Sequence, residues 1–149
     1  MSHLANLWFK FIYDPEKPAK SDWGLLIVRV VFGISLIVGH GWSKLTGFSE
    51  NAATFLDPLG IGSPLTLALT VFAEFFCAVA VVVGFKTRFV VLPVLVTMFV
   101  VLFVVHLGDP FTRIEKAVLY FAAYAALLVA GPGKYSLDAV IAHTLKARS

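Results

Sequence analysis

The fold of this chain is decided by residues 64–84, which read PLTLALTVFAEFFCAVAVVVG. This stretch is about as long as an α-helix that crosses the hydrocarbon core of a bilayer. Its single ionisable carboxylate, Glu74, lies at the middle. A charge at that depth is costly unless it faces the interior of a helix bundle and finds a partner there. The stretch therefore predicts a membrane protein with a polar interior.

The composition agrees with this assignment. The chain has 149 residues, of which 59% are hydrophobic, and a soluble domain would be far more polar. The single cysteine, Cys77, excludes an internal disulfide, a CxxC redox pair and a thiolate cluster. The net charge is only +3, and the basic residues lie at the ends of apolar runs rather than in one patch. We therefore expect no nucleic-acid binding.

The chain divides into three predicted parts. Residues 1–22 form an amphipathic N-terminal segment that lies at the membrane interface. Residues 23–131 form a bundle of four transmembrane helices, predicted at about 23–42, 64–84, 89–107 and 113–130. Residues 132–149 form an amphipathic cytoplasmic tail, whose helix Ser136 caps. The predicted fold is thus an all-α integral membrane four-helix bundle with amphipathic interfacial helices at both ends.

The basic residues predict the orientation. Four spans put both termini on one side of the membrane, and that side holds eight Lys and Arg residues against three on the other. Cytoplasmic loops carry the excess of basic residues. We therefore expect both termini in the cytoplasm. The connector 46–63 is apolar enough to lie at the opposite interface as a lid.

A stripe of five residues on the first span is predicted to face the bundle, because they recur at helical spacing: Arg29, Gly33, Leu36, His40 and Lys44. Arg29 is the expected partner of Glu74. Two interpretations of that pair remain open. It fixes how the helices pack, or it serves as a proton relay or a polar anchor for a ligand headgroup.

A second polar cluster is expected at the outer ends of the helices, and its members are His40, Lys44, His106, Asp109, Arg113, Glu115 and Lys116. The two histidines are either ordinary interfacial residues or donors to a quinone carbonyl, since histidine exchanges protons near neutral pH. Iron or zinc held by both histidines and Glu115 or Asp109 is a third alternative. No local ligand spacing supports it, so we predict no metal. Tyr120 and Tyr124 form either a packing stripe or a wall of the site.

Several blocks of the sequence resemble the DoxX family of small bacterial membrane proteins. They are Arg29, HGWSKL at 40–45, Glu74, GFKTR at 84–88, His106, Glu115 and GPGKYSLD at 131–138. The resemblance covers roughly residues 23–142. It implies a four-helix bundle in the bacterial inner membrane. It also implies a link to quinone-dependent sulfur oxidation, or to oxidative-stress complexes in which such chains are membrane partners of soluble redox enzymes.

The resulting hypothesis is a quinone-interacting subunit of a membrane redox system. In it, His40 and His106 contact the quinone carbonyls, and Arg29 and Glu74 supply a buried polar relay. The remaining predicted binding residues are Trp42, Lys44, Phe103, Glu115 and Tyr120.

Two alternatives come from other functional classes. The chain carries no flavin, haem or iron–sulfur motif, which favours a non-catalytic membrane anchor or assembly partner for a soluble oxidoreductase. A small transporter is the weaker alternative, because the four spans show no internal repeat. The expected partners are membrane lipid, quinone and a redox protein. An alanine-rich face on the fourth span could also join two copies of the chain.

Overall fold

The structure is a computed structural model, and it describes residues 19–147. Those residues form helices and connecting loops, with no strand among them. The all-α prediction is therefore confirmed. The predicted N-terminal interfacial segment lies outside the described residues, except for its last few positions, which belong to the first long helix.

Four long helical rods make up most of the described chain. The first joins α2 (Ala19–Leu36), η1 (Ile37–Gly41) and α3 (Trp42–Thr46), and the second joins α5 (Ser63–Val71), η2 (Phe72–Cys77) and α6 (Ala78–Val83). The third joins α7 (Thr87–Val100) and η3 (Val101–Val105), and the fourth is α8 (Phe111–Ala130). Two shorter helices are α4 (Phe48–Asn51), in the first connector, and α9 (Leu137–Ala147), after the last rod.

Three of these rods are long and apolar enough to cross a membrane: Ser21–Thr46, Ser63–Val83 and Thr87–Val105. The fourth rod, α8, has 20 residues, but Arg113, Glu115 and Lys116 give its first turns three charges. The prediction of a membrane protein is thus confirmed by three helices. A fourth crossing by α8 remains a prediction.

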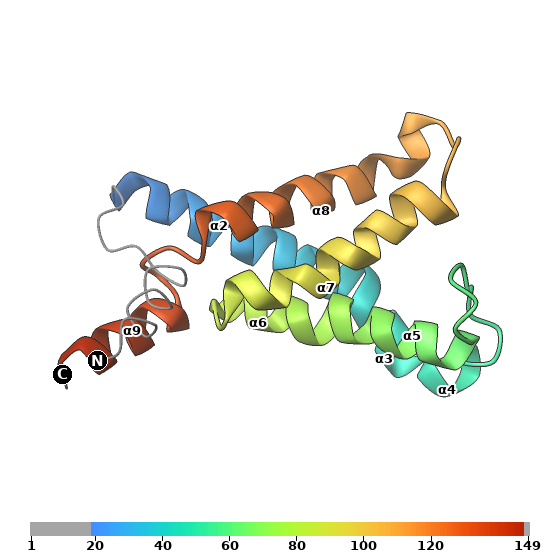
Figure 1. Ribbon diagram of the computed structural model, residues 1–149, viewed down its shortest axis with the longest axis horizontal. Coiled ribbons are helices and arrows are strands. Elements are labelled where there is room, and N and C mark those ends of the chain that lie inside the picture. Colours follow the sequence, from blue (N-terminus) through green and yellow to red (C-terminus); the bar gives the residue numbers. More distant parts are fainter. Residues whose placement is uncertain (1–18, 148–149) are drawn as a thin grey trace.

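The rods pack side by side in a way that leaves one end open (Figure 1). Helix α7 packs along α8, and α2 packs against α6 and α8. The core between them is apolar and contains Leu36, Ala78, Val81, Val91, Val94, Tyr124 and Leu127. At the end away from α9, the α7–α8 arm diverges from α5 (Figure 1). The side chains between the diverging arms form the site described below.

Two glycines of the first rod fix its register against the second. A Cβ atom at Gly41 would lie 2.5 Å from the carbonyl oxygen of Glu74, and a Cβ atom at Gly33 would overlap a methyl group of Val82. At Gly41 the neighbouring atoms belong to the backbone, and only glycine allows two backbones to approach this closely. The two rods run antiparallel, so Gly41 lies beside Glu74 and Gly33 beside Val82.

The opposite end of the bundle is closed by the segment between α8 and α9. The buried Arg29 guanidinium donates hydrogen bonds to the carbonyl oxygens of Pro132 (2.8 Å) and Tyr135 (2.5 Å). Asp138 accepts hydrogen bonds from the backbone N–H groups of Lys86 (2.7 Å) and Thr87 (3.0 Å), where α7 begins. These contacts tie the chain after α8 to the first and third rods.

The same segment starts the tail helix. The Ser136 hydroxyl accepts a hydrogen bond from the N–H of Ala139 at 3.1 Å, which confirms Ser136 as the predicted cap. The helix is amphipathic in sequence, but the side that it presents to the bundle carries Asp138 and Ala139. Its larger apolar side chains are exposed: Leu137, Val140, Ile141 and Leu145.

The predicted ion pair between Arg29 and Glu74 is wrong. Arg29 lies twelve residues before Gly41, which corresponds to about 18 Å along a helix. Because the antiparallel register places Gly41 beside Glu74, Arg29 comes to the far end of the second rod, where it approaches Gly84. The prediction that the five-residue stripe faces inward is confirmed, since its first three members are buried and the last two are half-buried.

Candidate functional site

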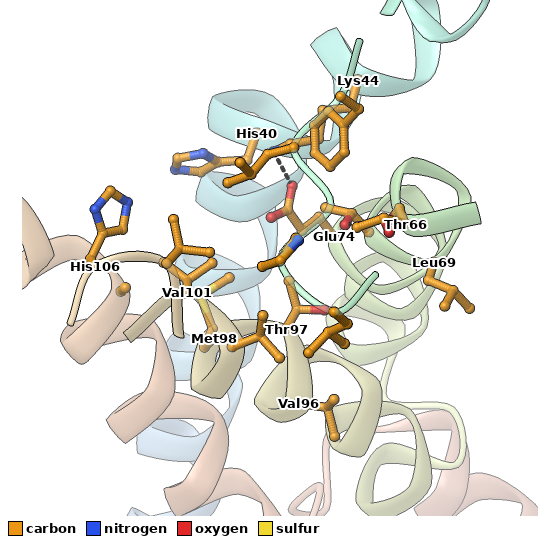
Figure 2. A pocket seen from close by; sticks show the side chains of 18 of the residues that line it. His40, Lys44, Thr66, Leu69, Glu74, Val96, Thr97, Met98, Val101 and His106 are labelled. Atoms are coloured by element: carbon orange, nitrogen blue, oxygen red, sulfur yellow. Dashed lines mark hydrogen bonds and ion pairs between the residues drawn. The ribbon is translucent and has the colours of Figure 1, made fainter. Parts of the chain in front are cut away.

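A cavity of about 470 Å³ lies between the diverging arms. Figure 2 shows His40, Glu74 and His106 around the same space, while Leu69 and Val96 lie on the side away from His106. Most of its surface is apolar, and the ionisable side chains labelled in Figure 2 lie on one side of it, whereas Thr66 and Thr97 lie toward Leu69 and Val96. Its ionisable and phenolic lining residues are His40, Lys44, Glu74, His106, Arg113, Lys116 and Tyr120.

Each of the three apolar rods changes from α-helix to π-helix beside this cavity. His40 and Gly41 belong to η1, Glu74 belongs to η2, and η3 ends one residue before His106. A π-helical turn is rare, and it is found frequently at functional sites because it redirects side chains that an α-helix would place elsewhere. The three turns therefore mark this end of the bundle as a candidate site.

An ion pair forms one wall of the cavity. The Lys44 ammonium donates a hydrogen bond of 2.5 Å to Oε2 of Glu74, and the residue Glu74 is only 4% exposed. The close approach at Gly41 brings the two helices together at this level. Lys44 thus takes the place that the sequence analysis assigned to Arg29. The ammonium has three N–H donors, and this contact uses one of them.

His40 lies against an aromatic wall. Its ring meets the ring of Tyr120 edge to face, with centroids 5.8 Å apart, and Tyr120 meets Phe32 in the same way at 6.0 Å. The Tyr120 ring thus packs against the first rod and also lines the cavity, whereas Tyr124 is buried in the core and does not line it.

His106 is held by a neighbouring carboxylate. Its Nδ1 lies 2.7 Å from Oδ2 of Asp109, which also accepts a hydrogen bond of 3.3 Å from Arg113. The hydrogen bond from His106, supported by Arg113, holds the pKa of the Asp109 carboxyl below its ordinary value. A carboxylate at Nδ1 fixes that nitrogen as the proton donor and leaves Nε2 to exchange protons with a ligand.

The connector between the first two rods covers the cavity. Asp57 accepts hydrogen bonds from the backbone N–H groups of Ile61 (3.1 Å) and Gly62 (2.7 Å) and from the Thr66 hydroxyl (2.9 Å). Gly62 has a φ of +99°, which favours glycine, so the chain can turn sharply into α5. The covering side chains are Phe55, Leu56, Pro58, Leu59 and Ile61. Their position fits the expected lid, while its movement stays a prediction.

Five of the nine predicted site residues line the cavity together: His40, Lys44, Glu74, His106 and Tyr120. Arg29 does not, because it lies at the other end of the bundle. Glu115 is exposed, one residue before the lining residue Lys116.

The two remaining aromatic predictions also lie away from the cavity. Trp42 comes two residues after His40, and Phe103 two residues after Val101. Two residues correspond to a rotation of roughly 200° around a helix, so each aromatic ring lies on nearly the opposite face from its lining neighbour. The exposed Trp42 lies near Phe75, with centroids 6.1 Å apart, and the exposed Phe103 lies near Phe99 at 4.7 Å.

Sequence reasoning missed three threonines that line the cavity, Thr66, Thr70 and Thr97. The signal for two of them is their spacing, since Thr66, Thr70 and Glu74 recur every four residues on one helix face. Among residues 19–147, no group of three or more His, Cys, Asp or Glu side chains is placed to hold a metal ion. Cys77 is buried in the apolar core.

The sequence matches the model of a protein family. The family model of DoxX matches residues 24–107, which include most of the first apolar rod, the whole of the other two, and the lining residues His40, Lys44, Glu74 and His106. Neither a curated protein nor a solved structure matches the chain. Since the family model covers more than half of the sequence, this membrane protein belongs to the DoxX family.

Proposed function

We propose that this protein is a quinone-binding subunit of a membrane redox system, and that the quinone headgroup occupies the polar end of the cavity. The observation that carries the proposal is the cavity itself. Small-molecule sites are typically hollows of about 300–1,000 Å³ with mostly apolar walls and a few convergent polar groups. A cavity of about 470 Å³ with two histidines and an ion pair at one end fits that description.

The donors of this cavity suit a ligand with carbonyl oxygens. A quinone supplies two such acceptors, and its reduction takes up two electrons and two protons. The Lys44 ammonium keeps N–H donors beyond its contact with Glu74. The imidazole rings of His40 and His106 each carry an N–H that can donate a hydrogen bond.

Glu74 and Asp109 position these donors. Glu74 holds the Lys44 ammonium against the cavity wall through their ion pair. Asp109 orients the His106 ring through Nδ1, so Nε2 is the ring nitrogen that remains for a ligand. Arg29 has no part in this chemistry, because it binds backbone carbonyls at the opposite end of the bundle.

The electrons come from a partner in this proposal. The sequence has no flavin, haem or iron–sulfur motif, and the DoxX resemblance implies soluble redox enzymes as partners. The chain would thus bring a quinone site to an oxidoreductase that supplies the electrons. A purely structural anchor is the competing function, and it requires no ligand in the cavity.

The test is quinone binding to the purified protein in lipid nanodiscs, measured with a ubiquinone analogue. Loss of one hydrogen bond of about 1.4 kcal/mol corresponds to about tenfold weaker binding. We expect that loss for His40→Ala and for His106→Ala. His143→Ala is the matched control, because His143 is an exposed histidine on α9.

Two results would refute the proposal. The first is an unsubstituted protein that binds no quinone analogue, and co-purification with a stoichiometric oxidoreductase would then support the anchor. The second is binding that is equal in all three histidine variants and in the unsubstituted protein.

A further inference from the structure

The cavity reaches the side of the bundle as well as its polar end. Leu69 on α5 and Val96 on α7 both line the cavity, yet they are 51% and 61% exposed. The connector residues Leu56, Leu59 and Ile61 also line the cavity and are exposed, so the cavity borders the protein surface there as well. Figure 2 shows Leu69 and Val96 on the side of the cavity away from His106. Leu69 and Val96 therefore mark a lateral opening between α5 and α7, in addition to the border at the connector.

This opening lies at a depth where the protein meets hydrocarbon. Leu69 is six residues after Ser63, the start of its span, and Val96 is nine residues before Val105, the end of its span. At the rise of an α-helix these offsets are about 9 Å and about 13 Å. The hydrocarbon core of a bilayer is about 30 Å thick, so both residues lie well inside it. In a bilayer crossed by these rods, lipid chains would therefore border the opening.

The packing of the rods explains why a gap exists here. Helix α7 is held against η2 and α6, whereas α5 continues toward the connector and separates from α7 (Figure 1). Asp57 fixes the start of α5 through the backbone of Gly62 and the hydroxyl of Thr66. The two helices therefore diverge above η2, and the space between them belongs to the cavity.

The surface of this part of the cavity suits a hydrocarbon chain. Its lining near the opening is aliphatic and includes Leu69, Val96 and Val100. The three threonines nearby donate their hydroxyl hydrogens within the protein: Thr66 to the Asp57 carboxylate at 2.9 Å, Thr70 to the Thr66 carbonyl at 2.8 Å and Thr97 to the Pro93 carbonyl at 3.0 Å. They therefore offer no hydroxyl proton to a ligand. The polar and apolar ends of the cavity thus match the two ends of an amphiphile.

We propose that the ligand is a membrane-dissolved amphiphile with an extended hydrocarbon chain, and that this chain leaves the cavity between α5 and α7 past Leu69 and Val96. The inference rests on the proposed quinone function for the headgroup. It adds that the ligand enters sideways from the bilayer and that the chain is part of what the site recognises.

The experiment compares two quinone analogues that share one headgroup, one with a decyl chain and one with a methyl group in its place. The variant Val96→Trp fills the opening with an indole ring. We expect it to weaken binding of the decyl compound at least tenfold and to change binding of the methyl compound less than twofold. Leu92→Trp is the matched control, because Leu92 is 45% exposed on the same helix and does not line the cavity.

A second measurement does not depend on substitutions. A decyl analogue with a diazirine at the end of its chain is irradiated in nanodiscs with the unsubstituted protein, and the labelled peptides are identified by mass spectrometry. Labelling of the segments around Leu69 and Val96 supports the inference. Labelling confined to the connector or to α9 overturns it.

The outcomes separate the two proposals. If both analogues bind the unsubstituted protein and Val96→Trp weakens the binding of both equally, the hydrocarbon chain of the ligand does not use the opening, and only this inference fails. If neither analogue binds the unsubstituted protein, the quinone proposal fails and takes this inference with it.

Discussion

The close contact between Gly41 and Glu74 gives the sharpest prediction about the site. In the variant Gly41→Ala, the new Cβ atom would lie 2.5 Å from the Glu74 carbonyl oxygen and 2.8 Å from its carbonyl carbon. Ordinary van der Waals contacts of a Cβ atom are 3.4–4 Å, so the first and second rods must separate by about 1 Å at this crossing. Both neighbouring atoms belong to the backbone, and neither can move aside as a flexible side chain would.

The expected cost of this separation is large for a single methyl group. Overpacking typically costs about 1–3 kcal/mol, and we expect the upper end of that range because the clash is with backbone. The same shift moves Lys44 away from Glu74 and enlarges the polar end of the cavity. Quinone-analogue binding should therefore weaken together with stability.

The assay is unfolding of the purified protein by SDS in mixed micelles, followed by circular dichroism. Gly39→Ala is the matched control, because Gly39 lies two residues away in the same π-helical turn and a Cβ atom added there would meet no atom within 4 Å. That variant should be as stable as the unsubstituted protein, or more stable by up to about 1 kcal/mol, because alanine loses less backbone entropy than glycine. Equal stability of Gly41→Ala and Gly39→Ala would refute the reasoning.

Arg29→Met should lower the free energy of unfolding by roughly 2–4 kcal/mol, since two carbonyls lose a charged hydrogen-bond donor. The affinity of the folded protein for the quinone analogue should stay unchanged. A loss of affinity without a loss of stability would contradict the placement of Arg29 away from the cavity. Glu74→Gln should destabilise the protein by about 3 kcal/mol because it leaves the Lys44 ammonium without its carboxylate, and adding Lys44→Met should restore part of that loss. A double-mutant cycle measures this coupling, and strictly additive effects would rule out the ion pair. The pKa of Asp57 lies below its ordinary value, chiefly because its carboxylate accepts a hydrogen bond from the Gly62 N–H, and the hydrogen bond from the Thr66 hydroxyl lowers it further. Its contribution to stability should therefore be complete above about pH 4 and be lost as the pH falls through the lower folded-state pKa. Thr66→Val should raise that pKa in a carbon-13 NMR titration of the carboxyl group, and an unchanged value would show that the hydroxyl does not matter.

The sequence by itself determined the class of the protein and the residues that face inward. Apolar runs of membrane-spanning length come from composition alone, and a helix of fixed pitch turns the spacing of Arg29, His40 and Lys44 into one inward stripe. It also predicted that His40 and His106 would share a site, since both come at the ends of spans that meet at the same end of the bundle.

The partner of Glu74 was decided only by the tertiary structure. Helical pitch says which way a side chain faces but not the level at which it meets another helix. That level depends on the close contacts of Gly33 and Gly41, which place Lys44 beside Glu74 and send Arg29 to the carbonyls after α8. The positions of the π-helical turns could not be predicted from the sequence either. The extra residue in such a turn is accommodated by packing between the rods and leaves no pattern of its own in the sequence.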